Sequence, residues 1–430
     1  MRLSGPHALE IADSLLTLRN SFAHAQARFA EIPDPETGVK LDEAIATYFA
    51  GPNSYTGEDV VEIAAHGSPV ILDLLVRSSL RRGARLARPG EFTERAFLCG
   101  RIDLTQAEAV RDLIESQTLY QARVAAGQMD GALSRRIKPA KQDLVDLIAI
   151  LEAGIDFAED DVDVTPDAEI VTHITAVERE LEKLERSFAR GRVVHSGLTL
   201  AIIGRPNVGK SSLFNRLVER DRAIVTAMPG TTRDLVTETV SLGGIPVQLV
   251  DTAGLREAAD EAESIGIQKS REAMADADIV LVVLEAGLPL REDEAALIGS
   301  LEGRRALVAS NKSDLNRNRE LPPRLSLTVV STSAVTGQGT TELREALLTL
   351  VSNSAGEAEE GMLTNIRHHD AVAAAVAALR KAAEAVGQKI PHEMLLLDLY
   401  AALRQLDSLT GETTADDILN RIFSSFCIGK

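Results

Sequence analysis

The chain has 430 residues, a formal net charge of −18 and a hydrophobic fraction of 45%. That length predicts two to four domains, and the acidic balance argues against broad, sequence-independent binding of nucleic acid, because phosphate contacts require Lys and Arg. The sequence contains no apolar run long enough for a transmembrane helix and no signal-peptide pattern at its start, and its two cysteines do not make a disulfide framework. We therefore expect a cytoplasmic protein.

The first part of the chain, residues 1–97, is predicted to be mixed α/β. Val60–Ala64 has the composition of a strand, and Pro69 is well placed in the first turn of a helix that runs to Leu80. A cluster of arginines accompanies this helix. A solvated helix face is favoured for the cluster over a local basic patch, and its members are Arg77, Arg81, Arg82, Arg85 and Arg88.

Helical periodicity marks the next part, residues 98–195. Apolar residues recur at i, i+3, i+4 and i+7 spacing in Leu144–Ile155 and again in Val177–Phe188. Between them lies the acidic run Glu159–Asp163. We interpret this run as a solvated linker rather than a metal site, because no spaced ligand series follows it.

A second helical part, residues 354–430, follows a linker predicted at Ser352–Glu357. Ala371–Ala385 is rich in alanine, and a leucine stripe follows at Leu395, Leu399, Leu403 and Leu406. Residues 98–195 and 354–430 are therefore predicted to form one helical domain that is discontinuous in the sequence. Insertion of another domain is tolerated because the termini of a domain often lie close together.

The inserted part, residues 196–353, alternates between short apolar runs and helical patterns. Ile279–Leu284 and Arg305–Ala309 are typical of strands buried on both faces. This alternation predicts a doubly wound, mainly parallel sheet. The fold class is thus a multidomain α/β and α protein with an N-terminal α+β domain, a discontinuous helical domain and an inserted α/β domain.

Gly204–Ser211 fits the phosphate-loop pattern G-x-x-x-x-G-K-[ST] and lies between a predicted strand, Leu198–Ile203, and a predicted helix. The glycines allow backbone N–H groups to face phosphate oxygens, and the helix N-terminus adds the positive end of its dipole. Lys210 is expected to reach the β- and γ-phosphates, and the Ser211 hydroxyl is expected to bind Mg²⁺. The predicted nucleotide contacts of this segment are Asn207, Val208, Gly209, Lys210, Ser211 and Ser212.

Four further segments follow in the order that a Ras-like GTPase requires. Thr231-Thr232 supplies a second hydroxyl for Mg²⁺ at Thr232, and Asp251–Gly254 ends an apolar strand. Asn311–Asp314 ends another strand, and Asp314 is matched to the N1–H and 2-amino donors of guanine, a pair that adenine lacks. Ser333-Ala334 suits a backbone contact to guanine O6. The predicted GTP contacts here are Thr226, Ala227, Met228, Pro229, Gly230, Thr231, Thr232, Asp251, Thr252, Ala253, Gly254, Asn311, Lys312, Asp314, Ser333 and Ala334.

The residue that orients water for hydrolysis is not fixed by the pattern alone. Many GTPases carry a glutamine directly after Asp-x-x-Gly, but Leu255 stands there and cannot orient water. Glu263 is one of several glutamates in the polar segment downstream. Arg233 and Arg256 could stabilise charge, although phosphate positioning or surface exposure suits them equally well.

Several further segments resemble the MnmE (TrmE) family of tRNA-modification GTPases over essentially the whole chain. They are Arg2–Pro6, Gly51–Asp59, Ala87–Phe97, the five nucleotide-binding segments described above and the terminal Phe426–Lys430. The two N-terminal motifs and the terminal Cys-x-Gly-Lys are highly specific, because other GTPases lack them.

The resemblance implies an N-terminal domain that forms a homodimer and binds a tetrahydrofolate derivative (5-formyl or 5,10-methylene) through Arg2, Glu62, Arg101 and Lys430. Arg101 stands where family members often have lysine, which keeps the charge but changes the geometry. The implied reaction adds an aminomethyl or carboxymethylaminomethyl group to C5 of the tRNA wobble uridine, with an FAD-dependent partner of the MnmG (GidA) type.

The family pairs two GTPase domains around a bound K⁺ during hydrolysis. On this chain the side chain of Asn207 would bind K⁺, with backbone oxygens of Thr226, Met228 and Thr231. The resemblance also selects Glu263 as the glutamate that orients water.

Two points stay open in the sequence. Cys427 is either a half-buried thiol or a participant in the uridine chemistry. Family members carry a strand before the Arg-x-Ser-Gly segment, so either the start at Met1 is truncated or an edge strand is missing. The alternative function is a non-catalytic GTPase switch in ribosome assembly, which the acidic composition and the folate-type motifs disfavour.

Overall fold

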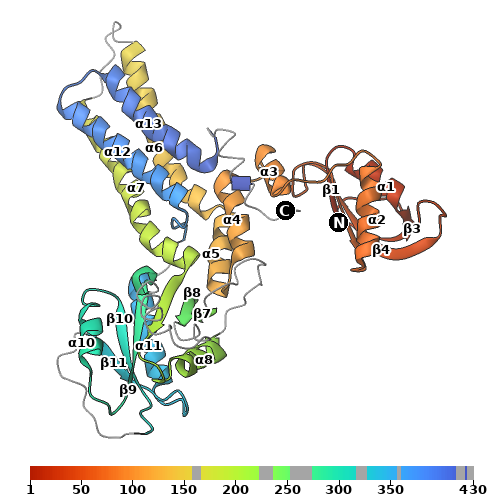
Figure 1. Ribbon diagram of the computed structural model, residues 1–430. Coiled ribbons are helices and arrows are strands. Elements are labelled where there is room, and N and C mark those ends of the chain that lie inside the picture. The colour runs from red at the N-terminus through yellow and green to blue at the C-terminus, as the bar shows by residue number, and fades with distance from the viewer. Residues whose placement is uncertain are drawn as a thin grey trace. The chain divides into compact units, whose positions relative to one another are not determined.

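The computed structural model describes residues 1–156, 166–221, 236–251, 274–315, 327–355, 360–412 and 422–423 (Figure 1). The chain divides into two compact units. One unit consists of Met1–Arg111, Gln128–Lys138 and Tyr400–Lys430, and the other consists of Asp112–Gly127 and Pro139–Leu399. Within the described ranges, no helix is both long and apolar enough to cross a membrane.

The N-terminal region is an antiparallel sheet with the strand order β1-β5-β4-β3-β2, accompanied by two helices. Alternate residues of the central strands, such as Ile32 and Ala44, are buried in one core with Ile11 and Leu75 of the helices. The predicted strand and the helix beginning at Pro69 are both confirmed. The elements are β1 (Arg2–Ser4), α1 (Ala8–Leu15), β2 (Thr17–Leu18), β3 (Ala27–Pro33), β4 (Lys40–Phe49), β5 (Val60–Ala65) and α2 (Pro69–Leu80).

Helices dominate the rest of the chain outside the inserted domain. The elements are α3 (Glu91–Leu98), α4 (Leu104–Glu115), α5 (Leu119–Met129), α6 (Ala132–Asp156), α7 (Asp167–Ser196), α12 (Ile366–Gly387) and α13 (His392–Thr410). The predicted periodic stretches are confirmed as helices, and Leu395, Leu399 and Leu406 are buried in α13.

Helices α7 and α12 lie side by side although the inserted domain separates them in the sequence (Figure 1). Gly191 of α7 lies against the segment just before α12, since a Cβ there would lie 1.9 Å from the carbonyl oxygen of Leu363. The Leu363 N–H donates to Ser187 Oγ at 3.1 Å, and Arg380 pairs with Glu178 at 2.7 Å. The packing of these two helices confirms a helical domain that is discontinuous in the sequence.

The inserted domain is a six-stranded sheet in the order β11-β10-β9-β6-β8-β7, parallel except for the β7–β8 pair. Alternate residues of the central strand β6 enter separate cores: Leu200 and Ile202 pack with α8 and α11, and Ala201 and Ile203 pack with α10. This confirms the doubly wound sheet. The elements are β6 (Leu198–Ile203), α8 (Lys210–Asp221), β7 (Val236–Leu242), β8 (Ile245–Asp251), β9 (Ile279–Glu285), α10 (Glu292–Gly299), β10 (Ala306–Asn311), β11 (Thr328–Ser331) and α11 (Thr340–Ala355).

One boundary differs from the sequence prediction. The predicted linker at Ser352–Glu357 is wrong over its first four residues, because α11 continues through Ala355. Ser and Asn have modest helix propensity, but the buried Leu347 and Val351 hold the helix against the sheet. The acidic run Glu159–Asp163 lies outside the described residues.

Candidate functional site

The phosphate loop joins the end of β6 to the start of α8, as predicted. Its backbone has positive φ at Gly204 (148°), Asn207 (64°) and Gly209 (95°). A Cβ at residue 204 would lie 2.3 Å from the carbonyl oxygen of Val283, and a Cβ at residue 209 would lie 2.3 Å from Asn311 Nδ2. The close approach of neighbouring strands therefore requires glycine at both positions.

Lys210 is fixed by the loop itself. Its Nζ donates to the carbonyl oxygens of Gly204 and Arg205, each at 2.8 Å, and the residue is 7% exposed. These bonds hold the ammonium beside the backbone that is predicted to wrap the phosphates. Ser211 and Ser212, in the first turn of α8, are exposed.

Asn311 connects three of the predicted nucleotide segments. Its side-chain Nδ2 donates to the Val208 carbonyl at 2.8 Å, and its Oδ1 accepts from the Ala334 N–H at 3.1 Å. The side chain is buried, so both bonds are protected from water. The structure thus brings the phosphate loop, the end of β10 and the Ser333-Ala334 loop together around one amide.

Charged side chains hold the two loops that are predicted to contact guanine, Asn311–Asp314 and Ser333-Ala334. Lys312, in left-handed conformation (φ 65°), pairs with Glu285 at 2.9 Å, and Asp314 is exposed. Arg216 of α8 donates to the carbonyls of Ala334 and Val335, each at 2.9 Å. The sequence prediction missed Arg216, because nothing in its local pattern distinguishes it from an ordinary exposed helix residue.

Some predicted site residues lie outside the described residues, namely Thr226, Ala227, Met228, Pro229, Gly230, Thr231, Thr232, Thr252, Ala253, Gly254, Glu263, Cys427 and Lys430, with Leu255, Arg233 and Arg256. Asp251 ends β8 as predicted. Within the described ranges, no cluster of three or more His, Cys, Asp or Glu side chains could hold a metal ion. The roles of these residues in binding Mg²⁺ and K⁺ remain predictions.

A second group of predicted residues meets in the N-terminal sheet. Arg2 and Glu62 are direct cross-strand partners of β1 and β5, and Arg2 donates to Glu62 Oε1 from Nε at 2.8 Å and from Nη2 at 2.5 Å. The Arg2 guanidinium lies over the rings of Tyr55 and Phe92, at 5.6 Å and 5.5 Å from their centroids. Arg101 is exposed, and its Cγ would lie 3.3 Å from a Cβ at Gly57.

One ionic network ties together the three segments that carry the N-terminal motifs. Arg95 of α3 donates to Glu58 at 2.7 Å and to Glu91 at 2.8 Å, and Ser4 donates to the same Glu58 oxygen at 3.1 Å. Glu91 also accepts from Arg85 at 2.8 Å. The hydrogen bonds from Arg85, followed by those from the Arg88 backbone and Arg95, lower the pKa of Glu91 to about 2.

Four of the five arginines in the cluster around α2 have bonding partners within their own unit. Arg77 pairs with Asp73 at 2.8 Å and Arg88 with Glu94 at 3.0 Å, and Arg85 pairs with the buried Glu91. These bonds compensate much of the positive charge, which supports the solvated face over a basic patch.

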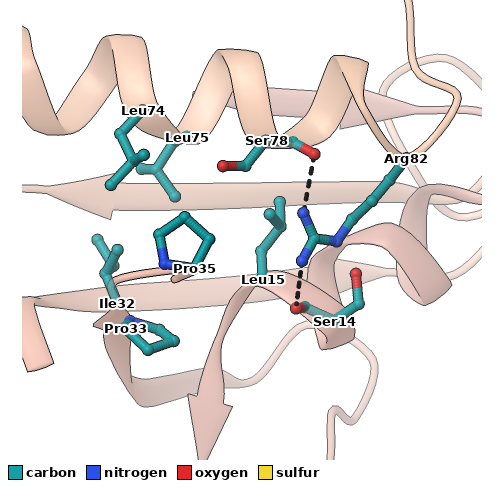
Figure 2. Close-up of a pocket in the computed structure, with 9 residues that line it drawn as sticks. All are labelled: Ser14, Leu15, Ile32, Pro33, Pro35, Leu74, Leu75, Ser78 and Arg82. Carbon is teal, nitrogen blue, oxygen red and sulfur yellow. Dashed lines mark hydrogen bonds between the residues drawn. The ribbon is translucent and has the colours of Figure 1, made fainter. Parts of the chain in front are cut away.

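The fourth, Arg82, borders a small cavity of about 30 Å³ between α2, the end of α1 and β3 (Figure 2). Its guanidinium donates to the carbonyl oxygens of Ser78 and Ser14. Ile32 and Leu75 supply apolar walls. None of the predicted site residues lines this cavity, and its size is that of about one water molecule.

Two family models match the chain: "GTP-binding protein TrmE N-terminus" over residues 1–101 and "MnmE helical domain" over residues 104–427. A relative from Koribacter versatilis, described as tRNA modification GTPase MnmE, is 62% identical over 100% of this chain and 95% of its own. A relative from Heliobacterium modesticaldum with the same description is 42% identical over 100% of this chain and 96% of its own length. Among solved structures, the G domain of the T. maritima FeoB iron transporter matches 36% of this chain and 98% of its own, with 27% identity and a TM-score of 0.28.

The two relatives match the chain from end to end, which includes both the N-terminal motifs and the nucleotide loops. The relatives are tRNA modification GTPases, which agrees with the function favoured by the sequence and not with a ribosome-assembly switch. The chain belongs to the MnmE family of tRNA modification GTPases.

Proposed function

We propose that this GTPase drives the addition of an aminomethyl or carboxymethylaminomethyl group to C5 of the tRNA wobble uridine, with a tetrahydrofolate derivative as one-carbon source and an FAD-dependent MnmG-type partner. The observation that carries the proposal is the meeting of Arg2, Glu62, Tyr55 and Phe92 beside β1. Such a cluster, distant in the sequence from the nucleotide loops, gives the chain a second candidate site besides its GTPase domain.

The donors and acceptors in this cluster suit a folate. A pterin presents a ring N–H and an amino group, which a carboxylate such as Glu62 can accept as a pair. The exposed Tyr55 ring and the partly exposed Arg2 guanidinium are flat groups that suit stacking. Arg101, with Lys430 at the chain end, would add positive charge for the folate carboxylates. Bound folate supplies the one-carbon unit, while the residues here bind and orient it.

Direct binding tests the folate site without requiring the complete reaction. Titration calorimetry of the full chain with 5-formyltetrahydrofolate should show binding that Glu62→Gln weakens about tenfold or more, because a charge-assisted pair becomes a neutral one. Lys40→Gln removes an exposed ion pair on the same sheet and should leave the affinity unchanged. Absence of binding to the wild-type chain would reject the site.

The reaction itself is tested by nucleoside analysis of tRNA. A strain that lacks this chain should lose the C5-modified wobble uridine, and the wild-type gene should restore it, whereas Glu62→Gln should restore far less. Purified chain with the FAD-dependent partner, tRNA, folate and GTP should form the same nucleoside. An unchanged wobble uridine profile in the deletion strain would reject the modification role.

For hydrolysis, we propose that Asn207 contributes to a K⁺ site and that Glu263 orients the attacking water. Asn207 is exposed at the left-handed turn of the phosphate loop, which suits its amide oxygen to a cation near the phosphates. A cation there would stabilise charge that develops in the transition state. Hydrolysis should therefore be faster in KCl than in NaCl at equal ionic strength, and Asn207→Ala should abolish the difference; equal wild-type rates would reject the K⁺ site.

The outer face of the N-terminal sheet supports a homodimer. Phe29 and Ile45 are cross-strand partners on β3 and β4, and they are 46% and 53% exposed, with Leu41 at 44% on the same face of β4. An apolar sheet face of this kind favours contact with another apolar surface, and a second copy supplies the matching one. Ile45→Glu should shift the full chain from dimer to monomer in light scattering, and a monomeric wild-type chain would reject the dimer.

A further inference from the structure

The phosphate loop is tied to helix α10 by an ion pair that links residues 89 positions apart. Arg205 Nε donates to Glu294 Oε1 at 2.6 Å, and the side chains are only 20% and 6% exposed. Glu294 Oε2 accepts the backbone N–H of Arg291 at 3.1 Å, which closes the first turn of α10. One carboxylate thus holds both the helix start and the loop arginine.

The ion pair anchors one side of the exposed turn of the phosphate loop. On its other side, the Val208 carbonyl is held by Asn311 Nδ2 at 2.8 Å. Between the two anchors lie Pro206 and Asn207, which are exposed. The Arg205 carbonyl also accepts from Lys210 Nζ at 2.8 Å. A shift of Arg205 would therefore move both the exposed turn and the acceptor that holds Lys210.

We propose that Glu294 is a positioning residue for GTP hydrolysis, because it fixes the phosphate loop through Arg205. Recognition of guanine lies at the other end of the site, on Asp314 and the Ser333-Ala334 loop, and it does not depend on this pair. Loss of the pair should therefore lower kcat more than it lowers nucleotide affinity. The inference concerns the GTPase activity alone and stands whether or not the folate and K⁺ proposals hold.

The charge of Glu294, rather than its volume, is the essential property. An ionised carboxylate makes a stronger and shorter bond to a guanidinium than a neutral amide does. Glu294→Gln leaves the side chain with one acceptor oxygen, which can still cap Arg291, but removes the charge that Arg205 requires. This substitution separates the loop anchor from the helix cap.

The test uses the full chain and steady-state GTP hydrolysis, GDP affinity by fluorescence, and thermal unfolding. Glu294→Gln should lower kcat about tenfold, with GDP affinity within about threefold of wild type and an unchanged unfolding temperature. Arg205→Gln should match it, and the double variant should be no slower than either single variant, because each already breaks the pair. Arg205→Lys keeps the charge and should recover part of the rate.

Lys183→Gln serves as the matched control. It removes an exposed ion pair with Glu180 on α7 and should leave every measured value unchanged. An unchanged kcat in Glu294→Gln would overturn the proposal. The proposal would also be overturned if the double variant lost kcat by the product of the two single losses. A fall in GDP affinity and unfolding temperature that parallels the fall in kcat would overturn it too, since that pattern indicates a merely structural role.

Discussion

Replacement of Glu91 by glutamine should loosen the N-terminal region strongly, because this buried carboxylate is the centre of the network that joins its three motif segments. Glu91 is 4% exposed and accepts from Arg85, from the Arg88 backbone and from Arg95. Glu91→Gln removes the charged partner of Arg85 and one of the two charged partners of Arg95, which keeps Glu58. The change in volume is negligible, so the effect isolates the charge.

The pKa of Glu91 gives the size of the effect. It falls from 4.5 to about 2, chiefly through the Arg85 hydrogen bonds, and at about 1.4 kcal/mol per pH unit this corresponds to about 3 kcal/mol. Because the pKa is lowered in the folded state, the stabilisation is complete above about pH 4.5. It is lost as the pH falls toward 2, and about 2 kcal/mol remains at pH 3.5.

Hydrogen exchange of the full chain, read by mass spectrometry, measures the effect locally. Peptides from β1, β5 and α3 should exchange about 100-fold faster in Glu91→Gln at pH 7, which corresponds to about 3 kcal/mol in the free energy of opening. After correction for intrinsic exchange, the ratio should shrink at pH 3.5. Peptides from β6 and β9 in the other unit should be unaffected.

Glu94→Gln is the matched control on the same helix. Glu94 pairs with the exposed Arg88 at 3.0 Å, and loss of such a pair costs under about 1 kcal/mol. If Glu91→Gln and Glu94→Gln gave equal exchange rates, or if the effect of Glu91→Gln did not decrease with falling pH, the electrostatic reasoning would be refuted.

Three further substitutions, the first with a matched control, test other parts of the chain. Gly244→Ala should cost about 3 kcal/mol in thermal or chemical unfolding, because φ is 86° and a Cβ would lie 2.6 Å from Cβ of Tyr120; Gly38→Ala, with positive φ but open space, should cost only about 1 kcal/mol. Asn311→Ala should weaken GDP binding at least tenfold by fluorescence titration, since it frees two loops at once. Asp314→Asn should shift hydrolysis from GTP toward XTP, whose 2-carbonyl accepts from an amide, and an unchanged nucleotide preference would contradict the assignment of Asp314 to the base.

Much of the fold could be predicted because its signals are local. Runs such as Ile279–Leu284 are continuous and apolar, and a strand buried on both faces needs no other information. Pro69 marks a helix start because its fixed φ suits that position. The end of α11 could not be predicted in this way, since Ser352–Ala355 resembles a linker in composition and is held helical by the packing of the residues before it.

The nucleotide loops could likewise be located from spacing, since a phosphate cradle requires particular residues in a fixed order. Their mutual support could not. Arg216 and Glu294 are unremarkable in the sequence, and they act through partners 118 and 89 residues away. Only folding selects such partners among the many charged side chains.

The sequence by itself therefore determined the order of elements, the family and the residues predicted to meet the nucleotide and the folate. The tertiary structure decided which side chains are held, and by what: Asn311 between two loops, Arg2 against Glu62, and Glu91 by two guanidinium groups and a backbone N–H. The physical reason is the range of the forces. Periodicity and motif spacing express backbone geometry over a few residues, whereas ion pairs and buried hydrogen bonds depend on which distant surfaces pack together.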